Sequence, residues 1–335
     1  RNKDFKRCKR AYNIPILPSK AGLECFLHSL QRKIWNDNMS LTLTIPSGQS
    51  SGLSFSACGA FSESVLKEMA DALALPEPCE MENPRDALQL VDPAYDRDGE
   101  RITRFRLSNI HYTGGPLDGV LCVEAPERFR KRSSRFAVIR MLLSIGYLRK
   151  ILKSDGKTGL LHGALPETQN GECVLLFGQS GIGKSTSMKR WESEGGICEA
   201  DDLLLLEESE GEFFCRPLPT WSRFFSDPEC RDTFPVMKRL HLKDALWLTR
   251  AEQGTPERIE QVHPGLWRAQ VLSAATIHLY DSMRILSESE KIYAGRKFMS
   301  LVQDITQKFG TRTLRASLDA NLHETINNGI KEAEQ

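Results

Sequence analysis

The sequence predicts an α/β protein, in which a core of mixed sheet and flanking helices follows a smaller α+β domain. Three observations predict this class. The first half of the chain begins with alternating apolar and polar residues at Leu41–Ile45 and Leu53–Ala57, a pattern typical of paired strands. A helical apolar pattern then covers residues 131–153. Beyond it, an apolar stretch, a glycine-rich loop and a helical pattern follow one another over residues 174–193, as they do in an α/β unit.

The length of 335 residues exceeds that of one small domain, so we expect two domains after a basic segment. Residues 1–40 are the basic N-terminal segment, residues 41–153 an α+β N-terminal domain, and residues 154–335 the second domain. The boundary falls at Ser154–Gly156, a turn-forming stretch beyond which the apolar pattern changes character.

Charge and cysteine usage narrow the class of protein. The chain has 45 basic and 44 acidic side chains, which provide no global field for nucleic acid or an anionic membrane, so we expect neither as a partner. Its nine cysteines include no Cys-x-x-Cys pair, which is typical of free thiols in a reducing compartment. The most apolar long stretch, Phe136–Leu148, is too short to cross a bilayer. The sequence therefore predicts a cytoplasmic protein.

The strongest functional signal is Gly178–Ser185, which matches the phosphate-binding pattern Gly-x-x-x-x-Gly-Lys-Ser in full. Glycines let backbone N–H groups turn inward around a phosphate, and the helix that follows adds the positive end of its dipole. We expect Lys184 to reach the β- and γ-phosphates and Ser185 to offer its hydroxyl to Mg²⁺. The residues expected to bind the nucleotide are Gly178, Ser180, Gly181, Ile182, Gly183, Lys184, Ser185 and Thr186.

An acidic pair and a histidine flank this motif. Asp201 lies 17 residues after Lys184 and is followed by Asp202 and the apolar stretch Leu203–Leu206. One carboxylate could hold a metal while the other accepts a proton from an attacking hydroxyl, although a solvated turn would carry the same residues. His162 lies 22 residues before Lys184. Its ring could face the phosphates if its strand neighbours the strand of the loop; otherwise it is a histidine of the core.

Together, Leu161–Leu165, Gly178–Thr186 and Ala200–Asp202 resemble in order and spacing the catalytic core of the HPr kinase/phosphorylase family, which is similar to that of phosphoenolpyruvate carboxykinases. The resemblance is specific over about residues 158–206 and looser onward to about residue 325. It implies a P-loop kinase core of the HPr kinase C-terminal type. It also implies ATP and Mg²⁺ as cofactors and transfer of the γ-phosphoryl group to a serine hydroxyl.

The resemblance also assigns roles to individual side chains. It makes Asp201, Lys184 and His162 the catalytic residues, with Asp201 as the general base, and makes Ser185 and Asp202 the magnesium ligands. The roles of the two aspartates stay open to exchange. An arginine that stabilises the transferring phosphoryl group is expected among Arg223, Arg258 and Arg268.

The segment after Leu206 departs from this family. The family's later glycine-rich signature is absent, and Arg216–Ser222 forms a Pro-rich, aromatic stretch that either braces a turn or shapes the acceptor pocket. This departure argues against HPr itself as the acceptor. Divergent members act on small substrates or on precursors of ribosomally made peptides. We therefore expect the acceptor to be a serine of a peptide or protein. A kinase for free serine and a nucleotide-binding regulatory protein without transfer activity are the alternatives.

Two basic clusters, Lys6–Arg10 and Arg128–Arg132, have no place in this account of the catalytic core. Each is either a solvated face or a contact for an acidic partner such as a leader peptide. Kinases of the resembling family often form rings, so the resemblance is also compatible with a homo-oligomer.

Overall fold

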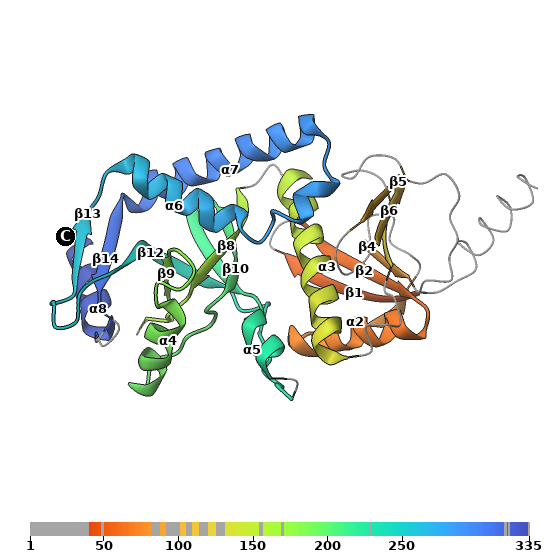
Figure 1. Ribbon diagram of the computed structural model, residues 1–335, viewed down its shortest axis with the longest axis horizontal. Coiled ribbons are helices and arrows are strands. Elements are labelled where there is room, and N and C mark those ends of the chain that lie inside the picture. Colours follow the sequence, from red (N-terminus) through yellow and green to blue (C-terminus); the bar gives the residue numbers. More distant parts are fainter. Residues whose placement is uncertain are drawn as a thin grey trace, which may run out of the picture. The chain divides into compact units, whose positions relative to one another are not determined.

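Two seven-stranded sheets organise the part of the chain that the structure describes (Figure 1). This computed structural model describes residues 40–47, 50–81, 88–91, 101–104, 109–113, 120–124, 131–153, 157–168, 171–227, 229–317, 320 and 322–333. The basic segment 1–40 therefore lies outside the described residues except for Ser40, the first residue of the first strand.

The first sheet has the strand order β3-β1-β2-β4-β7-β6-β5. Its strands are β1 (Ser40–Ser47), β2 (Ser50–Cys58), β3 (Cys79–Met81), β4 (Leu88–Val91), β5 (Arg101–Arg104), β6 (Asn109–Thr113) and β7 (Val120–Glu124). The hairpin expected at its start is confirmed, because β1 and β2 pair antiparallel with Leu43 opposite Phe55, and both side chains are buried. Helix α2 (Ala60–Ala72) follows β2 and buries Val65, Leu66 and Met69 against this sheet.

The second sheet has the order β11-β10-β8-β9-β12-β14-β13. Its strands are β8 (Thr158–Ala164), β9 (Cys173–Phe177), β10 (Leu203–Ser209), β11 (Glu212–Pro217), β12 (Leu240–Arg250), β13 (Arg258–Gln261) and β14 (Arg312–Ala316). Strand β12 pairs parallel with both β9 and β14, and the other pairings described in this sheet are antiparallel. Because β12 also pairs with β11, the five strands β11, β10, β8, β9 and β12 form a closed ring of pairings.

Helices cover both faces of the second sheet (Figure 1). The helices after β8 are α4 (Lys184–Ser193), α5 (Trp221–Ser226), α6 (Pro264–Thr276), the 3-10 helix η2 (Ser282–Ile285), α7 (Glu288–Phe309) and α8 (Leu322–Ala333). Of these, α5 and η2 pack against α3. Successive side chains of β9 point to opposite faces of the sheet, so each face packs against a different set of helices. Val174 and Leu176 pack with residues of α4 and α8, whereas Phe177 packs edge-on against Trp267 of α6, with ring centroids 5.2 Å apart. The expected class, a mixed α/β protein, is confirmed.

Helix α3 (Arg132–Lys153) shares its apolar surface with elements of both sheets. Its buried residues belong to the same core cluster as Phe55 of the first sheet and Leu203 of the second. The boundary predicted between residues 153 and 154 stays a prediction, and residues 154–156 lie outside the described residues. None of the helices that the structure describes is both long and apolar enough to cross a bilayer.

Close backbone packing positions the loop that follows β9. A Cβ atom on Gly178 would lie 2.9 Å from the carbonyl oxygen of Leu248, on the neighbouring strand β12. Backbone cannot yield as a flexible side chain does, so a side chain at position 178 would push the loop away from β12. Glycine at this position therefore serves a close approach between two parallel strands.

We predict that Gly178→Ala destabilises the protein by about 1–3 kcal/mol through this clash. Gly295→Ala is the matched control. A Cβ at Gly295, within α7, meets nothing within 4 Å, so alanine there should stabilise the helix by up to about 1 kcal/mol. Urea unfolding of both variants measures the two effects. Equal stability of Gly178→Ala and the wild-type protein would contradict the packing described for this loop.

Candidate functional site

The Gly178–Ser185 loop joins the carboxyl end of β9 to the first turn of α4. Gly181 and Gly183 have φ angles of 80° and 113°, a region that side chains disfavour, so glycine allows the loop to turn there. Ile182 packs against the core on the α4 side, which leaves only its backbone for a ligand. The other side chains that were expected to bind nucleotide through hydroxyl groups are exposed at this edge of the sheet: Ser180, Ser185 and Thr186.

Lys184 closes the loop on itself. Its Nζ donates hydrogen bonds to the carbonyl oxygens of Gly178 (2.8 Å) and Gln179 (3.1 Å), and the side chain is buried. Burial lowers the pKa of Lys184 to about 8, against the opposing effect of the Asp202 and Asp201 carboxylates. The loop thus holds a desolvated ammonium group, and the two predicted aspartates lie near enough to interact with it.

Asp201 precedes β10 and is buried. Its Oδ1 has no hydrogen-bond partner among the residues that the structure describes, and the same holds for Oγ1 of the buried Thr220. Both residues line one pocket of about 240 Å³, together with Arg223 and Asp232. Buried polar atoms are nearly always hydrogen-bonded, so two such atoms on residues of one pocket make it a candidate place for a polar ligand or a bound water.

Asp202, by contrast, is fully engaged. Its Oδ1 lies 3.2 Å from Nδ1 of His162 and 3.4 Å from Nε2 of His278, and its Oδ2 accepts from the backbone N–H of Trp221 at 3.2 Å. Burial would raise the pKa of Asp202, but the hydrogen bonds with His162 and His278 hold that pKa well below its usual value. Asp202 is therefore a carboxylate that stays ionised.

His162 lies on β8, which pairs antiparallel with both β9 and β10, so the strand of His162 neighbours the strand of the loop, the condition that the sequence analysis set for a role of His162 near the phosphates. Its Nδ1 lies 2.8 Å from the backbone carbonyl oxygen of Asp202. A carbonyl can only accept, so this nitrogen carries a hydrogen. The described contacts of the His162 ring run to Asp202 and His278, and they hold the ring against the acidic pair.

His278, just beyond α6, is a site residue that the sequence analysis did not identify. Its Nδ1 lies 3.3 Å from Nη2 of Arg140, on α3. Arginine donates and cannot accept, so Nδ1 of His278 is the acceptor and its Nε2 carries a hydrogen. This Nε2 lies 3.4 Å from Oδ1 of Asp202 and 3.1 Å from Nδ1 of His162, so the two ring nitrogens both donate to Asp202 and not to each other. The signal was weak, because His278 is 116 residues from His162 in the chain and belongs to no motif.

These three side chains could also be considered as a metal centre, because ligand atoms of His162, Asp202 and His278 lie within 4.8 Å of one another. Metal-bound histidines use an unprotonated nitrogen and donate with the other to an acceptor. Here a carbonyl oxygen faces Nδ1 of His162, and the donor Arg140 faces Nδ1 of His278. The arrangement therefore fits a hydrogen-bonded network that orients Asp202 better than it fits a cation held between the rings.

The three candidate arginines lie in different surroundings. Arg223, on α5, lines the pocket of Asp201 and donates to Asp232 at 3.1 Å. Arg258 pairs with Glu260 on β13, and Arg268 is exposed on α6. Nearby, Arg216 braces the chain by bonding Glu207 and the carbonyl oxygen of Met237. The stretch 216–222 thus both braces a turn, through Arg216, and contributes Thr220 to the pocket.

The residues at this edge of the sheet fit a magnesium nucleotide. Glycines with positive φ let the backbone of the loop curl around a phosphate chain. Burial deprives the ammonium group of Lys184 of contact with water, and phosphate oxygens would give this group a partner of opposite charge. Exposed Ser185 and ionised Asp202 are oxygen ligands of the kind that Mg²⁺ prefers. Asp201 keeps a carboxylate oxygen available for an acceptor group.

Comparisons with known proteins identify a family model that matches most of the second half of the chain. A sequence model of the family described as "SynChlorMet cassette protein ScmC" matches residues 124–331, more than half of the chain, and this range includes α3 and the whole second sheet. Among solved structures, the chain is weakly similar to the HPr(Ser) kinase/phosphatase from Coxiella burnetii, with 12% identity and a TM-score of 0.26, over 52% of this chain and 99% of that one. No curated protein matches the chain.

The pKa of Lys184 leads to a prediction about ATP binding. Below pH 8 the side chain is an ammonium group that can bind phosphate, and above pH 8 it loses its charge. The phosphates of ATP are already ionised over this range, so affinity should fall by up to about tenfold per pH unit above pH 8. Titration calorimetry between neutral pH and pH 9.5 measures this, and Lys184→Ala should bind weakly with a flat profile. A flat profile for the wild-type protein would contradict the prediction.

The contacts of Arg140 predict the tautomer of His278. Nitrogen NMR of histidine-labelled protein should show His278 protonated at Nε2 and unprotonated at Nδ1, with the signals assigned by comparison with His278→Gln. Adding Zn²⁺ to the nucleotide-free protein should leave these signals in place, with the half-exposed His241 as the internal control for nonspecific binding. Zn²⁺-dependent shifts at both His162 and His278 would instead establish a metal centre.

Proposed function

This chain belongs to the family of SynChlorMet cassette proteins ScmC, and we propose that it is an ATP- and Mg²⁺-dependent kinase that phosphorylates a serine hydroxyl of a peptide or protein. The proposal rests on the site in the second sheet, where a glycine-rich loop with a buried lysine lies near two aspartates of different character. Phosphoryl transfer requires mainly positioning and charge stabilisation from a protein, and this site offers both.

The observation that carries the proposal is the unsatisfied pair of polar atoms in the Asp201 pocket. Oδ1 of Asp201 and Oγ1 of Thr220 are buried without hydrogen-bond partners among the described residues, and the two residues line the same pocket. An acceptor hydroxyl placed there would donate to Asp201 and accept from Thr220. The nearby ammonium of Lys184 would lie on the phosphate side of that hydroxyl.

The Gly178–Ser185 loop binds the nucleotide in this proposal. Its backbone N–H groups and Lys184 hold the phosphates, while Ser185 and Asp202 hold Mg²⁺. When bound, Mg·ATP supplies the γ-phosphoryl group, which is transferred to the serine oxygen as the bond to the bridging oxygen of ADP breaks. Lys184 must exchange its hydrogen bonds with Gly178 and Gln179 for phosphate oxygens, which suits an ammonium group that burial has destabilised.

The two aspartates divide the work according to their surroundings. Asp202 has its pKa held well below the usual value, so it is a poor proton acceptor and a suitable metal ligand. Asp201 has a free carboxylate oxygen in the pocket, so it accepts the serine proton as the oxygen forms its bond to phosphorus. His162 and His278 act on this step indirectly, by holding Asp202 ionised and in place.

Arg223 is the arginine that we assign to the transferring phosphoryl group. It lines the pocket of Asp201, whereas Arg258 and Arg268 lie on β13 and α6. The carboxylates of Asp232 and Asp201 favour its charged form, although partial burial opposes them. A guanidinium group there could offset charge that develops during transfer.

A second acceptor has one observation in its favour. The pocket at Asp201, about 240 Å³, is of a size to hold a small molecule, which supports free serine as the alternative acceptor.

We predict that γ-labelled ATP transfers label to a serine-containing acceptor, and that Asp201→Asn reduces this transfer by about 10²–10⁴-fold while ATP still binds. Lys184→Ala should weaken both ATP binding and transfer. The acceptors to assay are peptides and proteins encoded in the same cassette, HPr and free serine. Asp281→Asn, at an exposed aspartate before η2, is the matched control and should behave as the wild-type protein.

The outcomes separate the functional classes. Label on a serine peptide that both active-site variants abolish supports the peptide kinase. Label on free serine alone selects the small-molecule kinase. ATP binding without labelling of any acceptor, unaffected by Asp201→Asn, would replace the kinase with a nucleotide-binding regulatory protein.

A further inference from the structure

Strand β12 extends past the start of the glycine-rich loop. Strand β9 ends at Phe177, which pairs with Trp247 of β12, but β12 continues to Arg250 and stays paired with β14 up to that residue. The carbonyl oxygen of Leu248 lies close to Gly178, as described above. Arg250 is two residues further along the strand, so it lies at the border of the loop.

Arg250 shares a face of the sheet with α4, the helix that the loop begins. Leu246 and Leu248 of β12 pack in one core cluster with Met188 of α4. Because successive side chains of a strand alternate between the two faces, the side chain of Arg250 follows these two leucines on the α4 side. Arg250 is exposed, whereas both leucines are buried. The row of apolar side chains on this face therefore ends in a cation at the border of the loop.

His162 occupies the same face on the other side of β9. Ala164 of β8 belongs to the same core cluster as Leu248, so His162, two residues before Ala164, also points to the α4 side. There it contacts Asp202. Strands β8 and β12 are the two neighbours of β9 in the sheet. The loop is thus flanked by the network of Asp202 on its β8 side and by Arg250 on its β12 side.

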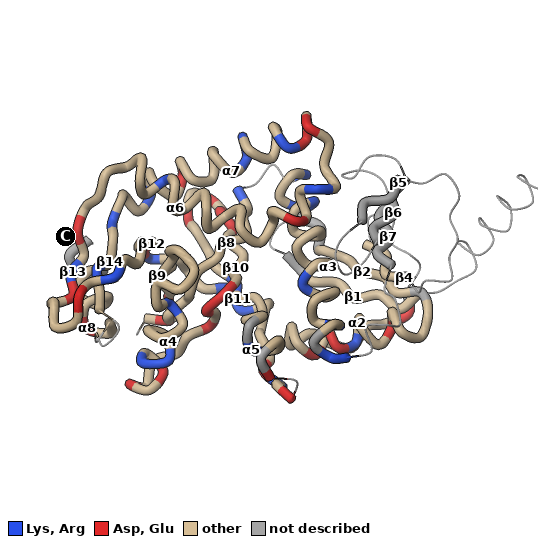
Figure 2. The backbone as a smooth tube through the Cα atoms, viewed as in Figure 1, with Lys and Arg blue, Asp and Glu red and all other residues tan. Residues whose placement is uncertain are grey.

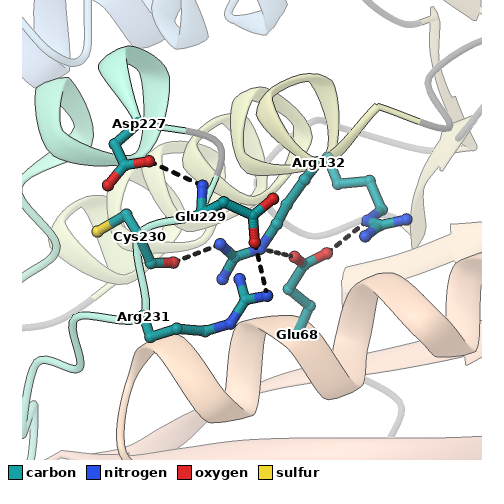
Figure 3. Close-up of polar contacts among 7 residues, drawn as sticks. Glu68, Arg132, Asp227, Glu229, Cys230 and Arg231 are labelled. Carbon is teal, nitrogen blue, oxygen red and sulfur yellow. Dashed lines mark hydrogen bonds and ion pairs between the residues drawn. The ribbon is translucent and has the colours of Figure 1, made fainter.

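The side chain of Arg250 has no ion pair or hydrogen bond with any residue that the structure describes. Other exposed arginines of the chain do have acidic partners, as Arg231 has in Glu229 (Figure 3). Strands β13 and β14 of the same sheet carry charges of both signs (Figure 2), and there Arg258 pairs with Glu260 at 2.8 Å. The charge of Arg250 is therefore available to an anionic ligand of the loop.

The direction of the nucleotide follows from the proposed function, on which this inference rests. Transfer to an acceptor at Asp201 requires the γ-phosphate to lie on the side of the acidic pair, toward β8 and β10. The phosphate chain then crosses the loop, and its α-phosphate, which carries the nucleoside, lies on the β12 side. A guanidinium group suits that position, because it can donate two parallel hydrogen bonds to phosphate oxygens.

We propose that Arg250 binds the α-phosphate of the nucleotide and so fixes the end of the phosphate chain opposite to the acidic pair. The inference deepens the proposed function by adding a nucleotide-binding residue outside Gly178–Ser185. Arg250 is a positioning residue for transfer, because it acts at a distance from the γ-phosphoryl group. No motif in the sequence marks it, since it reaches the loop only through the pairing of β9 with β12.

Nucleotide binding tests the proposal separately from transfer. Titration calorimetry with the full chain compares AMP, Mg·ADP and the magnesium complex of a non-hydrolysable ATP analogue. All three ligands carry the α-phosphate, so Arg250→Gln should weaken each of them by a similar factor, about tenfold. Arg250→Lys keeps the charge but not the paired hydrogen bonds, so it should recover only part of the lost affinity.

Arg258→Gln is the matched control. The side chain of Arg258 is 57% exposed, and the neighbouring Ile259 packs on the α4 side, so Arg258 points to the other face of the sheet. This variant should bind all three nucleotides as the wild-type protein does. Thermal unfolding without nucleotide should be the same for Arg250→Gln and the wild-type protein, because Arg250 is exposed.

Unchanged affinity of Arg250→Gln for all three nucleotides, or a loss confined to the ATP analogue, would overturn the inference and leave the proposed kinase intact. Losses that grow with the charge of the ligand would overturn it too, because they indicate a long-range field and not a contact with the shared phosphate. Similar losses for all three, without transfer of label to any acceptor, would support the role of Arg250 and remove the kinase activity. A wild-type protein that binds none of the three would overturn both.

Discussion

The pairing of β8 with both β9 and β10 is the constraint on which the site depends. It places Gly163 opposite Phe177, the last residue before the Gly178–Ser185 loop, and His162 opposite Leu203, the first residue after the acidic pair. Three segments that are separate in the chain thus end at one edge of the sheet. Because these pairings are backbone hydrogen bonds between buried strands, the loop and the two aspartates keep their relative positions without a ligand.

Helix α3 connects this site to the first sheet. Arg140, at its middle, fixes the tautomer of His278 and thereby the hydrogen bonds of Asp202. Its first turn carries Arg132, which holds the chain after α5 through the carbonyl oxygen of Cys230. One helix therefore reaches both the hydrogen-bond network of Asp202 and the segment that follows α5.

Local sequence patterns predicted those elements of the second sheet whose formation depends on residues close together in the chain. The loop, with β9 before it and α4 after it, is encoded by an apolar run, glycines and a helical pattern within twenty or so residues, and helix α4 spans Lys184–Ser193 as expected. Helix α6 was missed, because its apolar residues include the exposed Leu266 and do not form one clear stripe.

The network around Asp202 could not be predicted in this way. His278, which lies 116 residues from His162, reaches Asp202 only through tertiary packing. Arg140, which contacts His278, comes from a helix placed in the other predicted domain. Two adjacent acidic residues in a sequence also do not show that their surroundings differ. The difference arises because Asp202, and not Asp201, is bonded to the backbone of Trp221 and to the histidines. The sequence thus predicted the acidic pair, and the structure separates its members.

The central claim is that Asp201 and Asp202 have different roles. Single-turnover transfer of label from bound Mg·ATP, measured in Asp201→Asn and in Asp202→Asn, tests this claim most directly. The account predicts that Asp201→Asn binds Mg·ATP as the wild-type protein does but transfers label slowly at every Mg²⁺ concentration. It predicts that Asp202→Asn requires more Mg²⁺ and recovers transfer when Mg²⁺ is raised. The reverse pattern, with Mg²⁺ restoring Asp201→Asn and failing to restore Asp202→Asn, would contradict the division of roles and exchange the two aspartates.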